Sequence, residues 1–341
     1  MRDLQKLHSF GLPSAARNIH YVTDAKQATI AVFDPDSTLV LGEGTNIIFT
    51  EHFDGEIVLQ RSAGFSLTEQ TDGYSIRVQA GHNWHELVTE TLRMGIRGLE
   101  NLALIPGTVG AAPIQNIGAY GAEFKDFCTA VYGTFVDSSE TFSLSNKECH
   151  FGYRESVFKQ TRMRRALITE VELFLPREWQ ANTNYGGLDD FDAGVTAQAI
   201  FERVISIRSK KLPNHKKVGN AGSFFKNPVV SQAHMQQLKQ QYPTMPTFVA
   251  VQQGVTSELD VRYKIPAAWL IEQCGFKGKV YNGVGCYIKQ PLVIINCEPE
   301  RATGAALLTF ARRIRDAVQD KFCIKLQNEV TLMGSTGVIE L

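Results

Sequence analysis

The sequence predicts an α+β protein that is divided into two or three subdomains. It has 341 residues, more than one ordinary hydrophobic core accommodates, and 43% of them are apolar. Short runs of β-forming residues bounded by Gly or Asp dominate the first half, at 38–41, 56–59 and 74–80. After residue 213 the pattern becomes mainly helical. The strand-rich and helix-rich parts are therefore expected to be separate regions.

The remaining elements follow from local patterns. A helix is predicted at 84–94, because apolar residues from Trp84 to Leu92 share one face and Gly95 can end it. A second helix is predicted at 197–210, with Thr196 as its cap and Pro213 beyond its end. Further strands are predicted at 129–136, 166–175, 292–296 and 324–333, and further helices at 231–241, 266–274 and 299–322.

Composition excludes several classes of function. Lys+Arg and Asp+Glu both number 35, so no basic stripe is available for nucleic acid, and anionic substrates must meet a few placed cations. No apolar leader and no run of about 20 apolar residues is present, so neither a signal peptide nor a membrane span is expected. The six cysteines form no CxxC pair, which indicates scattered thiols in a reducing compartment.

A glycine pair follows the first predicted strand, in Leu41-Gly42-Glu43-Gly44-Thr45-Asn46-Ile47. Two glycines two apart allow a tight turn whose N–H groups point into one concavity, which suits phosphate oxygens. A dinucleotide-binding fingerprint needs a third glycine where Ile47 stands and a helix after it, so a Rossmann loop is excluded. An ordinary glycine turn in a hairpin is the alternative.

Residues 104–121 form a long loop of unusual composition. It holds four glycines and two prolines but no charged residue. Surface loops are usually polar. An uncharged glycine-rich loop suits close backbone approach to a flat, largely apolar ligand, with N–H groups bonding the ligand's polar edge. A buried crossover loop between subdomains is the alternative.

A third run, Gly219-Asn220-Ala221-Gly222-Ser223-Phe224-Phe225-Lys226-Asn227, presents a hydroxyl on a flexible turn anchored by two aromatic rings. A nucleophilic serine needs a strand-to-helix elbow with His and Asp partners, and the eight histidines offer no obvious partner. A proton-donating or binding role is therefore favoured over acyl transfer. A serine that caps a turn is the alternative.

Two weaker patterns are interpreted as structural. His82 and His85 are three apart, as metal ligands on a helix face are, but no Cys or third His clusters with them. No metal site is therefore predicted. The basic run at 162–165 is typical of a solvated loop.

In this order and at this spacing, the three loops resemble the UDP-N-acetylenolpyruvoylglucosamine reductases (UDP-N-acetylmuramate dehydrogenases). The resemblance covers nearly the whole chain, and its most specific part is the run at 219–228. The other matching segments are 9–11, 41–46, 98–102, 105–121, 151–156, 211–213 and 326–330.

The resemblance implies a fold, an activity and a setting. The fold is a vanillyl-alcohol-oxidase-type FAD-binding fold in two subdomains, 1–62 with 323–341 and 63–212, plus a C-terminal α/β substrate-binding domain at 213–322. The activity is the NADPH-dependent reduction of UDP-N-acetylglucosamine enolpyruvate to UDP-N-acetylmuramate through non-covalent FAD. This reaction belongs to peptidoglycan precursor synthesis and so to cell shape and division. A cytoplasmic monomer without nucleic-acid or membrane partners is expected.

The resemblance also assigns residues to roles. Arg154 and Glu329 would flank the substrate carboxylate, and Ser223 would be the proton donor. The first loop would hold the FAD pyrophosphate and the second would line the isoalloxazine and the ribityl chain. The expected FAD contacts are Gly42, Glu43, Gly44, Thr45, Asn46, Ile47, Ile105, Pro106, Gly107, Thr108, Gly110, Ala111, Ile114, Gln115, Asn116, Gly118 and Gly222. The expected substrate contacts are Tyr185, Arg208, Lys211, Asn227 and Gln290, where Tyr185 marks the family's first type, with a tyrosine loop over the UDP end.

The implied chemistry explains the three catalytic assignments. Hydride from flavin N5 reaches the terminal carbon of the enolpyruvyl double bond, and negative charge builds on the neighbouring carbon and its carboxylate. Arg154 can stabilise that charge, and a protonated Glu329 can donate to the same oxygens. Ser223 then protonates the carbon as general acid. NADPH would reduce the flavin first and leave the shared site.

Three departures from the family pattern and two other interpretations are noted. Ala111-Ala112 replace Ser or Gly, Gln327-Asn328 replace an acidic residue and Pro, and 286–289 is atypical. One other interpretation is an oxidase of the same fold that tethers FAD covalently. Its candidate attachment residues are His52, His82, His85 and Cys128. The second is a UDP-sugar-binding protein without redox activity.

Overall fold

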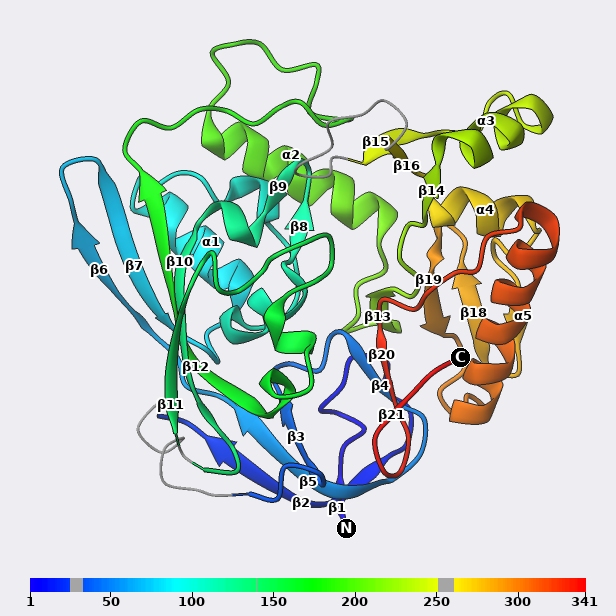
Figure 1. Cartoon of the computed structure of the whole chain (residues 1–341), viewed down its shortest axis with the longest axis horizontal. Helices are drawn as coiled ribbons and strands as arrows, with labels where there is room; N and C mark the ends of the chain where they lie inside the picture. Colours follow the sequence, from blue (N-terminus) through cyan, green and yellow to red (C-terminus); the bar gives the residue numbers. More distant parts are fainter. Residues whose placement is uncertain (25–32, 139, 251–260) are drawn as a thin grey trace. The chain divides into compact units, whose positions relative to one another are not determined.

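The computed structural model describes residues 1–24, 33–138, 140–250 and 261–341. The chain forms two compact units (Figure 1). Unit 1 comprises Met1–Arg2, Ala16–Gly44 and Asp54–Lys210, and unit 2 comprises Asp3–Ala15, Thr45–Phe53 and Lys211–Leu341. Strands and helices occur in both, so the predicted α+β class is confirmed. The boundaries of the three implied domains stay predictions.

A five-stranded antiparallel sheet forms the centre of unit 1, in the order β11-β10-β12-β7-β6. In its middle, Val171 of β12 lies opposite Val78 on one side and Val131 on the other, and all three are fully buried. Alternate residues therefore face the core, as the pleat of a strand requires. The strands are β6 (Phe65–Glu69), β7 (Gly73–Gln79), β10 (Cys128–Phe135), β11 (Thr141–Ser145) and β12 (Ala166–Pro176).

A four-stranded sheet, ordered β1-β2-β5-β3, leads into the first glycine loop. Its strands are β1 (Arg2–Asp3), β2 (Ala15–Val22), β3 (Thr38–Leu41) and β5 (Phe53–Gln60). β3 runs parallel to β5 and ends with Leu41 opposite Leu59. The chain therefore leaves a half-buried strand, whose last residue Leu41 is buried, directly at Gly42.

Two helices cover the core of unit 1, α1 (Trp84–Arg93) and α2 (Ala197–Lys211). Asn83 caps α1 by accepting a 3.0 Å hydrogen bond from the N–H of Glu86, and Gly95 follows the helix with φ +78°. The predicted start is confirmed, and the helix ends at Arg93, one residue before the predicted end. The shorter elements are β8 (Gly118–Ala119), β9 (Ala122–Glu123) and 3₁₀ turns at Glu100–Leu102, Val109–Ala111, Pro113–Gln115, Phe124–Asp126, Val157–Lys159 and Met163–Arg165.

Unit 2 is built on a four-stranded antiparallel sheet ordered β13-β19-β18-β17, with α4 and α5 beside it (Figure 1). Leu307, Ile314 and Val318 of α5 are fully buried, at the spacing of an amphipathic helix. The elements are β13 (Gly219–Ser223), β17 (Val280–Tyr281), β18 (Val284–Tyr287), β19 (Gln290–Asn296), α4 (Ala267–Gln273) and α5 (Gly304–Phe322).

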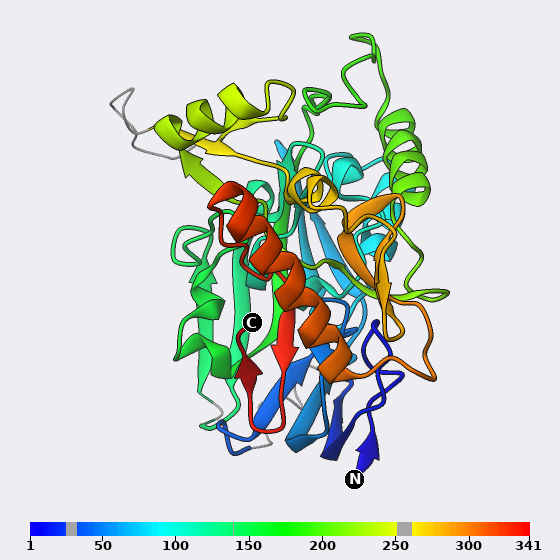
Figure 2. The same ribbon diagram turned by 90° about the vertical axis from the view of Figure 1, so that its right-hand side faces the viewer.

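Two three-stranded sheets complete unit 2. One is ordered β14-β16-β15, and the other is ordered β21-β20-β4. β20 pairs with β4 in parallel, with Leu332 opposite Ile48, and forms a hairpin with β21 (Figure 2). The elements are β4 (Ile47–Phe49), β14 (Val229–Ser231), β15 (Phe248–Ala250), β16 (Arg262–Lys264), β20 (Thr331–Met333), β21 (Val338–Ile339) and α3 (Gln232–Gln241).

Two predicted elements were placed wrongly. The last helix begins at Gly304 and not at 299, because a turn closed by the Ala302 N–H and the Glu298 carbonyl precedes the cap Thr303. The strand predicted at 324–333 is limited to Thr331–Met333 and is followed by the short β21. None of the helices in the described ranges has the length and apolar character needed to cross a bilayer.

Candidate active site

The side chain of Glu43 ties the first glycine loop to the second. Asn83 Nδ2 donates a 2.7 Å hydrogen bond to Glu43 Oε1, and the Gly107 N–H donates one of 3.1 Å to Oε2. Both carboxylate oxygens thus have donors inside the protein, so this acidic residue is compensated within a loop that is predicted to hold a phosphate. The two loops also touch at Gly42, where a Cβ would lie 2.6 Å from Thr108 Oγ1.

The backbone of these loops fits a dinucleotide cofactor such as FAD. Gly44 has φ +65° and Gly107 has φ +119°, backbone values that residues other than glycine rarely adopt. Turns with such a residue expose successive N–H groups as an anion-binding concavity. Part of the glycine requirement is packing within the protein, because a Cβ on Gly110 would lie 2.5 Å from the Cβ of Ala80. If FAD is bound there, the first loop would hold its pyrophosphate and the uncharged second loop would line its ring.

Arg154 lies in a tight turn whose ends pair through Gly152 and Glu155. Its backbone has φ +55°, which is uncommon outside glycine, Asn and Asp. Arg154 Nη2 donates a 3.2 Å hydrogen bond to the Gly118 carbonyl, and Lys159 Nζ donates one of 2.5 Å to the Arg154 carbonyl. The second glycine loop and the residues after the turn therefore both fix this arginine.

Two further predicted residues of unit 1, Arg208 and Tyr185, both interact with Tyr120, and Arg208 also feels the charge of Arg154. Burial is the main cause that lowers the pKa of Arg208; the charge of Arg154 lowers it too, whereas Tyr120 raises it. In the described part of the chain, the buried Nε of Arg208 has no hydrogen-bond partner. The Tyr120 ring meets the Tyr185 ring edge to face at 5.5 Å. The prediction missed Tyr120, although it belongs to the uncharged loop and precedes Gly121.

Ser223 and Glu329 lie on paired segments of unit 2. Ser223 ends β13 opposite Val293, and Phe224 and Phe225 behind it are buried in the core. The Glu329 N–H donates a 2.8 Å hydrogen bond to the Phe224 carbonyl, and Phe225 pairs with Asn328. Two residues more than 100 positions apart in the sequence are thus fixed as backbone neighbours.

Asn46, at the end of the first loop, belongs to unit 2 and is hydrogen-bonded to the segment that carries Glu329. Asn46 Nδ2 donates a 3.3 Å hydrogen bond to the Glu329 carbonyl, and the Thr331 N–H donates one of 3.0 Å to the Asn46 carbonyl. Of the predicted substrate contacts in unit 2, Asn227 accepts a 2.9 Å hydrogen bond from the Ala267 N–H through Oδ1. Gln290 opens β19, and Lys211 is exposed.

The units divide the predicted site residues into two groups. Gly42, Glu43, Gly44, the second loop, Arg154, Tyr185 and Arg208 belong to unit 1. Thr45, Asn46, Ile47, Lys211, Gly222, Ser223, Asn227, Gln290 and Glu329 belong to unit 2.

The candidates for covalent flavin attachment have other environments. His82 Nδ1 accepts the Gly64 N–H at 3.2 Å, and His85 Nδ1 accepts the Leu104 N–H at 3.0 Å. Burial raises the pKa of the Cys128 thiol, which disfavours the nucleophilic thiolate. His52 is exposed. In the described residues, no three His, Cys, Asp or Glu side chains gather as metal ligands would.

Comparison with known families defines the class first. Residues 25–138 match the family described as "FAD binding domain", and this stretch contains both the first and the second glycine loop. Residues 213–333 match the "UDP-N-acetylenolpyruvoylglucosamine reductase, C-terminal domain", which contains Ser223 and Glu329. An FAD-binding domain joined to a reductase domain makes the chain an FAD-dependent oxidoreductase. Both parts of the implied fold are therefore confirmed.

Relatives then identify the family. The UDP-N-acetylenolpyruvoylglucosamine reductase of Pseudoalteromonas atlantica is 42% identical over 100% of this chain and 96% of its own. That of Shewanella baltica is 44% identical over 98% and 97%. The crystal structure of the reductase from Thermus caldophilus has the same fold, with TM-score 0.63 at 22% identity over 97% and 99% of the two chains. The chain belongs to the UDP-N-acetylenolpyruvoylglucosamine reductase family, as the sequence motifs predicted.

Proposed function

We propose that this chain reduces UDP-N-acetylglucosamine enolpyruvate to UDP-N-acetylmuramate, with NADPH as the hydride donor. The backbone hydrogen bond between Glu329 and Phe224 supports this proposal best. Because Ser223 directly precedes Phe224, this bond holds the hydroxyl of Ser223 and the carboxyl of Glu329 on adjacent segments. Reduction of an enolpyruvyl group calls for such a pair, an acid for the carbon and a donor for the carboxylate. Bound FAD supplies the hydride.

Arg154 would meet the substrate carboxylate. A guanidinium forms charge-assisted hydrogen bonds with carboxylate oxygens, and these strengthen as negative charge builds on the enolate. The contacts of Arg154 with Gly118 and Lys159 hold it ready before the substrate arrives. Preorganised charge of this kind contributes to rate and not only to binding.

Ser223 and Glu329 would complete the reaction. Glu329 in its protonated form donates a hydrogen bond to the substrate carboxylate. Ser223 gives its proton to the carbanionic carbon next to that carboxylate. The buried rings of Phe224 and Phe225 anchor the serine backbone, so the hydroxyl moves little during the transfer.

Five of the predicted residues would contact the nucleotide-sugar end of the substrate. The guanidinium of Arg208 is desolvated, and its buried Nε has no hydrogen-bond partner among the described residues. This Nε would donate a hydrogen bond to a phosphate oxygen of the UDP group. Tyr185, half exposed and in contact with Tyr120, would cover the UDP end. Lys211, Asn227 and Gln290 are the other three predicted substrate contacts. The reaction would serve peptidoglycan synthesis in the cytoplasm, and thereby cell shape and division, with the enzyme acting as a monomer.

A two-step spectrum tests the proposal. The purified chain, loaded with FAD and freed of excess, should lose its visible flavin absorbance when NADPH is added without oxygen. Addition of the enolpyruvyl substrate should restore the absorbance with formation of UDP-N-acetylmuramate. Bleaching that the substrate does not reverse would reject the assignment, and acid precipitation that leaves the supernatant colourless would indicate a covalent flavin.

A further inference from the structure

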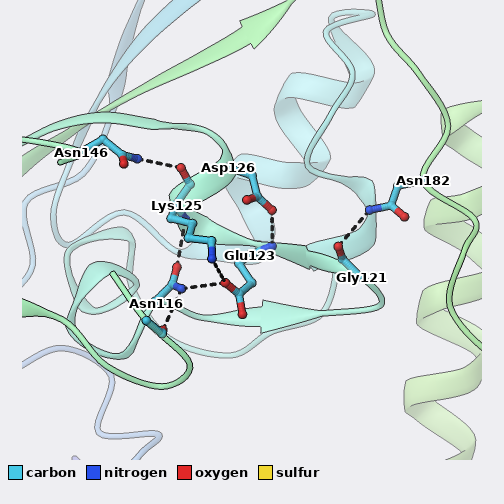
Figure 3. A network of polar contacts seen from close by, with 8 residues as sticks. Asn116, Gly121, Glu123, Lys125, Asp126, Asn146 and Asn182 are labelled. Atoms are coloured by element: carbon cyan, nitrogen blue, oxygen red, sulfur yellow. Dashed lines mark hydrogen bonds and ion pairs between the residues drawn. The ribbon is translucent and has the colours of Figure 1, made fainter. Parts of the chain in front are cut away.

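Asn116 is fully buried inside the second glycine loop, and its side chain is occupied by the protein itself. Nδ2 donates 3.0 Å hydrogen bonds to Glu123 Oε2 and to the Gly152 carbonyl (Figure 3). Oδ1 accepts a 2.9 Å hydrogen bond from the Lys125 N–H. Both N–H donors and one oxygen lone pair are therefore used within unit 1.

The orientation of this amide is fixed by charge. Glu123 Oε2, which accepts from Asn116, is also 2.8 Å from Lys125 Nζ, so a carboxylate faces the amide nitrogen. Exchange of the amide oxygen and nitrogen would place oxygen against that carboxylate and against the Gly152 carbonyl. The second N–H of Asn116 is therefore held on the Gly152 carbonyl.

That carbonyl begins the turn that carries Arg154. Gly152 and Glu155 exchange backbone hydrogen bonds of 2.9 and 3.3 Å across the turn, and Arg154 between them has φ +55°. A non-glycine residue in this conformation costs free energy and persists only where its surroundings hold it. Two more contacts come from the same loop, Ser156 Oγ to the Ile114 carbonyl at 2.6 Å and Arg154 Nη2 to the Gly118 carbonyl at 3.2 Å.

We propose that Asn116 is a positioning residue for Arg154 and that its side chain is not a flavin ligand. Its hydrogen bond to the Gly152 carbonyl fixes the turn of Arg154 to the predicted flavin loop. Arg154 is the arginine that would bind the substrate carboxylate. The predicted contact of residue 116 with FAD would then be made by its backbone alone. This inference rests on the proposed function, because that function gives Arg154 its carboxylate.

The informative change is Asn116→Gly. It removes the clamp on Gly152 but adopts the native φ of +44° without strain. Asn146→Asp is the matched control, because Asn146 Nδ2 also donates to two backbone carbonyls, those of Lys125 and Cys128, at 2.7 and 2.8 Å. Asn146 belongs to the same network, where it bonds Lys125 (Figure 3), and neither of its two side-chain hydrogen bonds goes to the Arg154 turn.

The two half-reactions separate positioning from general damage. In Asn116→Gly, FAD content and the rate of flavin reduction by NADPH should stay within about twofold of wild type, because neither needs Arg154 on a carboxylate. The rate of reoxidation by the substrate should fall roughly 10- to 100-fold, as expected for a misplaced catalytic group. Substrate affinity, followed by the change it causes in the flavin spectrum, should weaken as well. Asn146→Asp should lower the thermal midpoint without this kinetic pattern.

A double-mutant cycle with Arg154→Ala decides the matter. If Asn116 acts through Arg154, the Asn116→Gly change should slow reoxidation by no more than about twofold once the arginine is gone. Additive losses, or an equal fall in the NADPH half-reaction, would overturn the positioning role. Absence of substrate-driven reoxidation in the wild-type protein would instead overturn the proposed function, so the two failures are distinguishable.

Discussion

The N–H of Glu329 donates a 2.8 Å hydrogen bond to the carbonyl of Phe224, the residue that follows Ser223. The predicted proton donor and the predicted carboxylate partner are thus fixed to one another by the main chain. Substitution of either side chain leaves this backbone bond in place. Mutations at these two positions should therefore report on chemistry and not on folding.

Ser223→Ala should separate the two half-reactions. NADPH should still reduce the flavin, because no proton donor is needed there, while substrate-driven reoxidation should fall by about 10²- to 10⁴-fold. Stopped-flow absorbance of the flavin bands measures both steps. Turnover at a rate near that of wild type would refute the general-acid assignment.

Glu329→Gln should be less damaging than Glu329→Ala. The amide keeps a hydrogen-bond donor for the substrate carboxylate, whereas alanine leaves those oxygens without one. The comparison is best made on kcat for substrate reduction, with thermal midpoints as a check that both variants are folded. Equal losses in the two variants would contradict a donor role for this carboxyl group.

Glu43→Ala should weaken FAD binding. It removes the acceptor for Asn83 and for the Gly107 N–H and so loosens the two glycine loops from each other. Hydrogen bonds to a charged group are worth about 1.5–3 kcal/mol, so FAD affinity should fall roughly 10- to 100-fold. Titration of the FAD-free protein measures it, and Glu178→Ala, at an exposed position, is the control. An unchanged affinity would show that the carboxylate does not organise the loops.

Stability should depend on pH through His8. Burial lowers its pKa from 6.5 to about 4, although the Leu12 carbonyl and Asp3 favour the charged form. Between these values the unfolded chain binds a proton that the folded chain does not, so the free energy of unfolding falls as the pH falls. From about pH 7 to about pH 5 the loss should be roughly 2 kcal/mol. In His8→Gln, urea unfolding should lack this part of the pH dependence; an unchanged slope would exclude His8 as its source.

Local patterns predicted the elements whose signals are contained in a few neighbouring residues. The helix at Trp84 carries its own cap at Asn83 and its own stop at Gly95, and the structure has both. The strand predicted at 324–333 is too long at its start, because backbone groups between 324 and 330 form hydrogen bonds outside a regular strand pairing. Among these is the bond of Glu329 to Phe224, which is not part of a regular ladder.

The site was harder to predict in detail than the family. The motifs identified which loops matter, but not which side chains bond the protein and which are open to ligands. Glu43 and Asn116 both belong to predicted FAD loops, and both have their polar atoms bonded within unit 1. Tyr120 was missed because its link to Tyr185 depends on a contact between residues 65 positions apart, which no local pattern encodes.

The parallel pairing of β20 with β4 constrains how the protein is made. Ile48 leaves the ribosome almost 300 residues before its partner Leu332. The fully buried side chain of Ile48 must therefore remain without its final neighbour until Leu332 has been synthesised, and contacts of such long range also close slowly. A nascent chain halted before residue 331 would lack this sheet, and a chaperone that shields the early strand during translation should raise the yield of active enzyme.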